Sequence, residues 1–537
     1  MLLHTWPFLI FLLIFLPVFF ALRHTRLWSV WLLAASYFFY GWWNPYYLLL
    51  VLYSTVLVFL VVTLMDRCPP DGQKVDVLAR LARLKFEDRV AKIVFLVSTL
   101  ATLGCLGLAL AGPASSRPVL GALGWIMLLM AVGALSSSRP LWLLIGLLNN
   151  LAPLFFFKYA RFFTENVNAV LAWLHLSAKL TDPAAFMPFG LNYLLPIGIS
   201  FYTFQSLSYL IDFYLGKVPR EGNLLRYANF SCFFPQLMAG PIERAGHLLP
   251  QFGQFPAIRW QNFTDGLSLF LVGLFKKLAL AGYLSLYVDR VYEHAQSSGA
   301  PALILATFAF GWQLFFDFSG YTDMARGVAK FMGFDLVLNF NHPYLATSVA
   351  DFWRRWHISF SRWILDYIFM PLQMRWRDWR SPKVATAAAL LVTFLVSGIW
   401  HGAAWTFVIW GILHGLGLVL TRELDQSAFY RKRVPKLVKQ AGIFVFVSFT
   451  WIFFRADSLA DAWLIVRRIF TAVWQGPQIP ALMLALVALI WLYQALCESK
   501  VRYLLATGVA RISVAVFILL YLCLCSSGGG SFIYFQF

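Results

Sequence analysis

Two histidines stand where an ionisable side chain is costly unless the protein uses it. His401 lies at the junction of two apolar runs, TFLVSGIWHGAAWTFVIWGILHG, and no charged residue occurs from position 384 to position 420. An ionisable group inside a membrane is a functional candidate by default. The competing interpretation is a histidine that only packs helices, because Gly398 and Gly402 form a GxxxG pair around it, as Gly411 and Gly415 do around His414.

His357 lies among arginines and aromatic residues in ADFWRRWHISFSRWILDYIFM, residues 350–370. The spacing predicts a helix there, with Trp353 and Ser361 one turn to either side of His357 on the same face. Arginines beside a histidine suit anionic groups such as phosphates. A mid-membrane charge costs about 2.5–3.5 kcal/mol, so the segment must line a polar interior or lie at the interface. The competing interpretation is an interfacial aromatic and basic belt.

Two stretches before His357 supply further polar side chains. Such a cluster is expensive to keep in a membrane protein without a use, although interhelical hydrogen bonds would account for part of it. The stretches are FGWQLFFDFSGYTDMA and LNFNHPYLATS, and the side chains are Gln313, Asp317, Ser319, Tyr321, Asp323, Asn339, Asn341 and His342.

Several common catalytic motifs are missing from the sequence. It contains no GxSxG, HExxH, GxxxxGK[ST] or GxGxxG, so serine hydrolases, zinc proteases, P-loop enzymes and Rossmann enzymes each lack their motif. The six cysteines are scattered without metal-ligand spacing, so we expect no disulfide framework and no metal site. We also expect no bound cofactor. What remains is acid–base chemistry by histidine inside a helical bundle, or transport.

The remaining sequence must hold these residues in a membrane. A chain of 537 residues that is 60% hydrophobic and 12% charged is too apolar for a soluble domain. A spanning helix needs roughly 20 apolar residues, and the runs lack the alternation of a barrel strand. We therefore predict an all-α polytopic transmembrane bundle forming one domain, 1–537. The candidate spans are 5–22, 27–43, 46–64, 93–112, 119–137, 141–157, 191–215, 264–288, 301–318, 384–400, 403–420, 441–454, 481–497 and 512–525.

The distribution of basic residues predicts the orientation. Lys and Arg number 43 against 24 Asp and Glu, a net charge of +19, and the excess collects in the loops 23–26, 66–92, 375–383 and 431–439. Basic loops face the cytoplasm, which puts the N-terminus outside. The excess is thus a topology signal, and we expect no nucleic-acid partner. The stretch 223–247 is weakly apolar and contains prolines and glycines, so we expect a re-entrant or broken segment there.

Six separated motifs, in order, resemble the membrane-bound O-acyltransferases, in particular bacterial members that O-acetylate alginate. The likeness covers roughly residues 1–64 and 140–537. The motifs are LPIGISFYTFQSLSYLIDFY (195–214), FPQLMAGPIERA (234–245), GWQLFFDFSGYTDMARG (311–327), NFNHPYLATSVADFWRRWHISFSRWILDYIF (339–369), SGIWHGAAWTFVIWGILHG (397–415) and the ending FIYFQF.

The resemblance implies a fold of many helices around a central tunnel, with His401 near-essential and His357 as a second characteristic histidine. It implies an O-acetyltransferase (acyltransferase class) of the bacterial inner membrane, embedded in membrane lipid. The donor would be cytoplasmic acetyl-CoA, a substrate and not a cofactor. The acceptor would be a hydroxyl of a periplasmic partner protein or of an exopolysaccharide such as alginate or cellulose. His401 is expected to act as base and His357 to orient donor or acceptor, with a tunnel lined by Asp317, Ser319, Asn339, Asn341, Arg354, Arg355 and Trp400.

Two functions other than acetyl transfer stay open, and residues 66–138 depart from the family pattern. One alternative function is transfer of D-alanine or another acyl group to a teichoic acid-type polymer. The other is a non-enzymatic polysaccharide transporter whose His and Arg only line a path. The departure is residues 66–138, an atypical insertion with a basic loop and two extra candidate spans. Because two extra crossings return the chain to the same side, we expect the insertion to leave the downstream topology unchanged.

Overall fold

A computed structural model describes residues 1–68, 89–111, 117–187, 193–378, 381–474, 481–499 and 507–525. Helices make up most of these residues, and no strand occurs among them. Eight helices in the described part are long and apolar enough to cross a membrane, and five shorter apolar helices accompany them. The predicted all-α polytopic class is confirmed. The chain divides into two compact units, residues 17–238 with 243–256 and residues 1–16 with 239–242 and 257–537.

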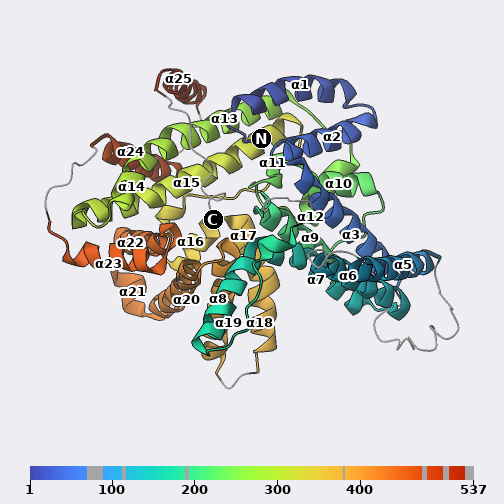
Figure 1. Ribbon diagram of the computed structural model, residues 1–537. Helices are drawn as coiled ribbons and strands as arrows, with labels where there is room; N and C mark the ends of the chain where they lie inside the picture. Colours follow the sequence, from blue (N-terminus) through green and yellow to red (C-terminus); the bar gives the residue numbers. More distant parts are fainter. Residues whose placement is uncertain are drawn as a thin grey trace. The chain divides into compact units, whose positions relative to one another are not determined.

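The unit formed by residues 17–238 and 243–256 contains the first half of the chain (Figure 1). Helix α1 (Trp6–Leu22) leads into it. Short 3-10 turns cover Pro45–Tyr47, Pro183–Phe186 and Leu249–Gly253. Its helices are α2 (Leu27–Gly41), α3 (Leu48–Asp66), α5 (Arg89–Ala111), α6 (Arg117–Ser136), α7 (Arg139–Leu154), α8 (Ala160–Trp173), α9 (Ile199–Tyr214), α10 (Leu224–Cys232), α11 (Phe234–Leu237) and α12 (Ala245–Leu248).

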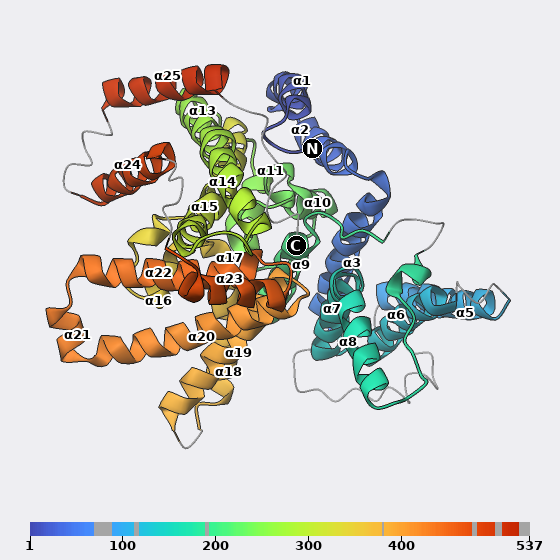
Figure 2. The ribbon, with the colours of Figure 1, turned by 60° about the vertical axis from the view of Figure 1, so that its left-hand side comes forward.

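Helices α5 and α6 occupy the predicted insertion and pack along each other in Figures 1 and 2. Leu100 and Leu110 on α5 are 68% and 75% exposed, as expected of apolar side chains that face lipid. The role of the insertion stays a prediction, and most of its basic loop (69–88) lies outside the described residues. The broken segment predicted within 223–247 is confirmed, because α10, α11 and α12 are three short helices. The span predicted for 191–215 shortens to α9, which is buried along most of its length.

The other unit carries the second half of the chain (Figure 2). Helices α13 and α14, joined by a π-helical turn Lys276–Ala281, form one apolar run of 34 residues that lies along α15. The 3-10 turn Pro343–Leu345 and the π turn Leu365–Phe369 flank the segment of His357. The helices are α13 (Trp260–Phe275), α14 (Gly282–Glu293), α15 (Ala300–Phe331), α16 (Val349–Arg355), α17 (Ile358–Ile364), α18 (Met370–Arg375), α19 (Pro382–His401), α20 (Trp405–Gln426), α21 (Ala428–Arg433), α22 (Lys436–Arg455), α23 (Leu459–Thr471), α24 (Ala481–Glu498) and α25 (Gly508–Cys525).

The single helix predicted over 350–370 is wrong. Helix α16 begins at a cap in which the Ser348 hydroxyl accepts a hydrogen bond from the Asp351 N–H, and it ends at Arg355. Trp356 is then extended, and His357 takes the left-handed conformation before α17 begins. Apolar periodicity continues across this break, so the sequence pattern alone cannot reveal it. The break places His357 in a turn between two helices.

Helices α19 and α20 cross at van der Waals contact through two glycines. A Cβ atom on Gly398 would lie 2.2 Å from the carbonyl oxygen of Phe407, and one on Gly411 would lie 2.3 Å from that of Phe394. Small residues at such crossings let membrane helices approach closely. The close crossing holds the end of α19, where His401 lies, against α20.

Gly411→Ala is therefore expected to destabilise the protein by about 1–3 kcal/mol, because overpacking forces the two backbones apart. Thermal unfolding of the detergent-solubilised protein measures the effect. Gly442→Ala on α22 is the matched control, since a Cβ there meets nothing within 4 Å and alanine favours a helix. Equal unfolding midpoints for the two variants would contradict the tight crossing.

Candidate functional site

The backbone around His357 is held by a short paired segment. The N–H of Asn341 donates to the carbonyl of Arg355 and the N–H of Ile358 donates to the carbonyl of Asn339, each at 2.9 Å. Between these two bonds His357 has φ 43° and ψ 54°, the left-handed region that a residue with a side chain enters only at a cost. The paired segment supplies the hydrogen bonds that would otherwise continue the helix. It thereby fixes the direction in which the imidazole leaves the chain.

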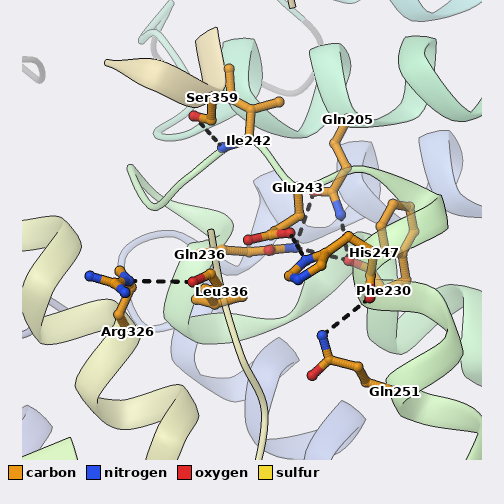
Figure 3. A network of polar contacts seen from close by, with 10 residues as sticks. All are labelled: Gln205, Phe230, Gln236, Ile242, Glu243, His247, Gln251, Arg326, Leu336 and Ser359. Carbon is orange, nitrogen blue, oxygen red and sulfur yellow. Dashed lines mark hydrogen bonds and ion pairs between the residues drawn. The ribbon is translucent and has the colours of Figure 1, made fainter. Parts of the chain in front are cut away.

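The side chain of Asn339 gathers three donors at one oxygen. Its Oδ1 lies 3.1 Å from Nδ1 of His357, 3.2 Å from the backbone N of Ser359 and 3.0 Å from the Ser359 hydroxyl. The Ser359 hydroxyl also accepts a hydrogen bond from the N–H of Ile242 at 3.0 Å (Figure 3). Asn339 and His357 are 1% and 0% exposed. This cluster, Asn339 with His357 and Ser359, is called the Asn339 clamp below.

Both candidate histidines contact the same two aromatic side chains. The ring of His357 lies 5.1 Å from Phe360 and 6.2 Å from Trp400, and the ring of His401 lies 5.4 Å and 4.9 Å from the same two rings, centroid to centroid. Phe360 and Trp400 stack on each other at 4.2 Å. The break before α17 and the end of α19 therefore bring the two histidines to one aromatic cluster. The two histidines are 44 positions apart in the sequence, and no sequence pattern indicates that they lie close together.

His401 ends helix α19 and is 5% exposed. Beyond Phe360 and Trp400, its ring packs edge-on against Trp410 of α20 at 4.9 Å and Phe454 of α22 at 5.3 Å. Helices α17, α20 and α22 thus contribute aromatic rings to its surroundings, besides its own helix α19.

His357 is enclosed in the same manner. Phe318 of α15 lies edge-on to it at 4.7 Å, and Phe340 lies at 6.5 Å. Burial lowers the pKa of His357 to about 3, so the side chain is neutral at physiological pH. Neutral imidazole carries one proton and one lone pair, and the partner of each nitrogen decides which nitrogen carries which.

His414 has a structural role. The indole N–H of Trp353 donates to its Nδ1 at 3.2 Å, so Nε2 carries the proton and faces the Thr450 hydroxyl at 2.9 Å. The Thr450 hydroxyl in turn donates to the carbonyl of Val447. Both ring nitrogens are thereby satisfied by neighbouring helices, as expected of a helix-packing histidine.

Asp317, predicted to line a tunnel, lies 3% exposed on α15 and forms an ion pair with Lys277. Lys277 belongs to the π-helical turn after α13 and is itself 4% exposed. Lys277 is not among the residues predicted from the sequence, although a charge inside the apolar run 264–288 indicates a candidate. Burial, with the positive charge of Lys277 as a smaller cause, lowers the pKa of His4 to about 4.

Breaking this ion pair from one side is expected to be costly. Asp317→Asn would leave the Lys277 ammonium buried without its counter-charge, at about 3–5 kcal/mol. Thermal unfolding should therefore show Asp317→Asn to be less stable than the double variant Asp317→Asn with Lys277→Met, which removes both charges. A stable Asp317→Asn protein that has lost activity would instead support the tunnel role.

The other predicted tunnel residues lie in different surroundings. Ser319 is buried on α15, and Trp400 lies in the aromatic cluster. Arg355 forms ion pairs with Asp351 and, from α24, with Glu498. The side chains of Asn341 and Arg354 are exposed. Their contribution to a tunnel stays a prediction.

The motif 234–245 contributes to a second polar network, in the unit that holds α9 to α12. The carboxylate of Glu243, fully buried, lies 2.8 Å from Nδ1 of His247 (Figure 3). Gln236 Nε2 donates to Gln205 Oε1 and to the carbonyl of Phe230. Neither Glu243 nor His247 is among the residues predicted from the sequence. The sequence feature that indicates such a polar network is a carboxylate inside a stretch broken by Pro and Gly.

Comparison with known proteins identifies a family and several relatives. The sequence model described as "MBOAT, membrane-bound O-acyltransferase family" matches residues 187–461. A Pseudomonas aeruginosa protein named "Probable alginate O-acetylase AlgI" is 38% identical over 354 residues, 65% of each chain. A Helicobacter pylori peptidoglycan O-acetyltransferase is 35% identical over 61% of this chain and 64% of its own length. A Streptococcus thermophilus teichoic acid D-alanyltransferase is 30% identical over 46% of this chain and 61% of its own.

The match is partial in length. This chain spans about 65% of the curated alginate and peptidoglycan relatives. The region matched by the family model contains the Asn339 clamp, His401 and the Lys277–Asp317 ion pair. The rings of Phe360 and Trp400 lie within the same matched range.

Proposed function

Because the chain belongs to the membrane-bound O-acyltransferase family, we propose that it is an O-acetyltransferase that acts on a hydroxyl of a polysaccharide or of a polysaccharide-modifying partner. The supporting observation is that two buried histidines far apart in sequence contact the same pair of aromatic rings. Acyl transfer to a hydroxyl needs a base and a group that orients the reactants. Two histidines in one apolar cluster can supply both.

The proposed donor is acetyl-CoA, a thioester that reaches the cluster from the cytoplasm. His401 accepts the proton of the acceptor hydroxyl while the hydroxyl oxygen attacks the thioester carbonyl carbon. The C–S bond then breaks, and the CoA thiolate takes the proton from the His401 imidazolium. The products are an acetyl ester and CoA thiol, so atoms and charge balance. Apolar surroundings favour the neutral histidine at the start of this cycle.

His357 is proposed to orient the reactants rather than to carry the proton. Its backbone turn and the Asn339 clamp hold the imidazole in one direction. Holding two reactants in a near-attack geometry lowers the activation free energy of a bimolecular reaction substantially. Ser319 and Trp400, buried in the same unit as the histidines, are proposed to complete the lining of the substrate path.

The proposed setting is the bacterial inner membrane, with the N-terminus on the periplasmic side and a periplasmic partner protein that receives or passes on the acetyl group. The apolar helices support the multi-pass membrane location. The basic loops support the orientation, since Lys and Arg collect on the cytoplasmic side. The named alginate and peptidoglycan relatives support a polysaccharide as the final acceptor.

A second candidate is transfer of a D-alanyl group, favoured by the similarity to a teichoic acid D-alanyltransferase. Its donor would be a carrier-protein thioester instead of acetyl-CoA. The third possibility is transport without catalysis, which predicts no turnover of any thioester. The identity of the transferred acyl group distinguishes acetyl transfer from D-alanyl transfer, and the absence of any thioester turnover distinguishes transport from both.

The test uses membranes that contain the protein together with the partner encoded beside it. Radiolabelled acetyl-CoA and alginate or cellulose are supplied, and both label in polymer and free CoA thiol are measured. Label in the polymer with one CoA released per acetyl group supports the proposal. Release of no CoA with intact acetyl-CoA overturns it in favour of transport, and label only from D-alanyl carrier protein favours the second candidate.

A further inference from the structure

The oxygen and nitrogen of the Asn339 amide can be told apart by its neighbours. The backbone N–H of Ser359 lies 3.2 Å from the atom assigned as Oδ1, and a backbone N–H can only donate. The atom that faces it must therefore accept, which only the amide oxygen can do. The orientation of the amide is thus settled by its hydrogen-bond partners.

The position of the proton on His357 follows from this oxygen. Its Nδ1 lies 3.1 Å from this oxygen, which accepts and cannot donate. Nδ1 must then carry the hydrogen. In a neutral imidazole with the proton on Nδ1, the lone pair is on Nε2.

We propose that Asn339 is a positioning residue that holds His357 as the Nδ1–H tautomer, so that His357 offers a lone pair on Nε2, and not an N–H, to the reactants that it orients. The inference rests on the proposed acyl transfer and deepens it. Asn339 acts through His357 and does not itself need to touch the reacting atoms. Its assignment thereby changes from tunnel lining to orientation of a histidine.

Three further features of the Asn339 clamp support its role in positioning His357. His357 is held in the left-handed backbone conformation, so the surrounding structure must over-determine its position. The Ser359 hydroxyl donates to Oδ1 of Asn339 and accepts a hydrogen bond from the N–H of Ile242, a residue outside the 339–358 segment. Nδ2 of Asn339 is buried without a hydrogen-bond partner among the described residues. All the bonds made by this side chain are thus accepted by Oδ1.

Aromatic side chains surround His357, and the oxygen of Asn339 contacts its Nδ1. Helix α15 presents Phe318, α17 presents Phe360 and α19 presents Trp400. The elements packed around it carry titratable or charged groups. These are Asp317 (paired with Lys277), Asp323, Arg326 and Lys330 on α15; Lys383 and His401 on α19; Arg362 on α17; and Asp351, Arg354 and Arg355 on α16.

Asn339→Asp is the sharpest test, because a carboxylate can accept all three hydrogen bonds that Oδ1 accepts and no donated bond is lost. The change adds one negative charge beside Nδ1. An opposite charge favours imidazolium and raises its pKa by about 1–3 units, so the acid limb of the rate profile should move to higher pH by that amount. Asn339→Leu has no acceptor and should lose on the order of 10²-fold in rate at every pH.

The tautomer itself is read by solid-state NMR of protein labelled with nitrogen-15 histidine in lipid bilayers. The His357 signals are those that disappear in His357→Gln. They should show a protonated Nδ1 in the wild type and in Asn339→Asp, and loss of that single tautomer in Asn339→Leu. Ser359→Ala is the matched control, since it removes one bond of the clamp but leaves the Asn339–His357 bond, and its His357 tautomer should match the wild type.

The outcomes separate this inference from the proposed function. A protonated Nε2 at His357 in the wild type, or an unchanged tautomer in Asn339→Leu, would overturn the role of Asn339 while the acyl transfer proposal stands. Full transfer of acetyl from acetyl-CoA by His357→Gln would instead remove His357 from the reaction, whatever its tautomer. If Asn339→Leu does not fold, Asn339→Asp and Ser359→Ala carry the test.

Discussion

His401→Ala is expected to lower the rate of acetyl transfer from acetyl-CoA by about 10²–10⁴-fold, the contribution typical of a positioned base. The side chain ends α19 in an aromatic cluster, and its replacement by alanine makes the span more apolar and leaves the α19–α20 crossing through Gly398 and Gly411 intact. Membrane insertion and yield should therefore stay near those of the wild type. Label transferred to polymer, normalised to protein in the membrane, is the measurement.

His414→Ala is the matched control for His401→Ala, since both histidines are buried and contact Trp410. Removing His414 leaves the Trp353 N–H and the Thr450 hydroxyl without that partner, so the expected effect is on the unfolding midpoint. Transfer per folded molecule should fall far less than in His401→Ala. Wild-type polymer acetylation by His401→Ala would exclude this residue as the base.

His357→Ala is expected to lower transfer on the order of 10²-fold, because a misplaced acceptor hydroxyl costs about that much in an otherwise intact site. The residual rate comes from His401, which remains in the aromatic cluster. Single-turnover release of CoA thiol, measured against polymer acetylation, separates slow chemistry from failed delivery of the acetyl group.

The surface residue His294 supplies the control for His357→Ala. His294 lies just after α14, is exposed, and contacts the Arg290 carbonyl through Nδ1. His294→Ala should therefore transfer acetyl at the wild-type rate. If His357→Ala does the same at matched membrane levels, the segment is an interfacial aromatic and basic belt and not part of the reaction.

The all-α class and the positions of most helices could be predicted from sequence, because a helix that crosses lipid must satisfy its own backbone and expose apolar side chains over a known length. The spans at α3, α5, α19, α20 and α22 follow from that local rule. Helix ends were harder to predict. Helix α15 continues to Phe331 instead of ending near 318, because burial inside the bundle replaces lipid as the environment of its polar second half.

His357 and His401 can be recognised as candidates from the sequence, since ionisable groups in apolar or aromatic runs are rare and costly. Their arrangement depends on contacts between distant segments. The apolar periodicity of the sequence predicts one helix through His357. In the structure, backbone hydrogen bonds with residues 339–341 interrupt that helix, and the imidazole contacts Asn339. Long-range hydrogen bonds also made His414 structural and paired Asp317 with Lys277. Such contacts join residues distant in sequence, so no local pattern encodes which donor meets which acceptor.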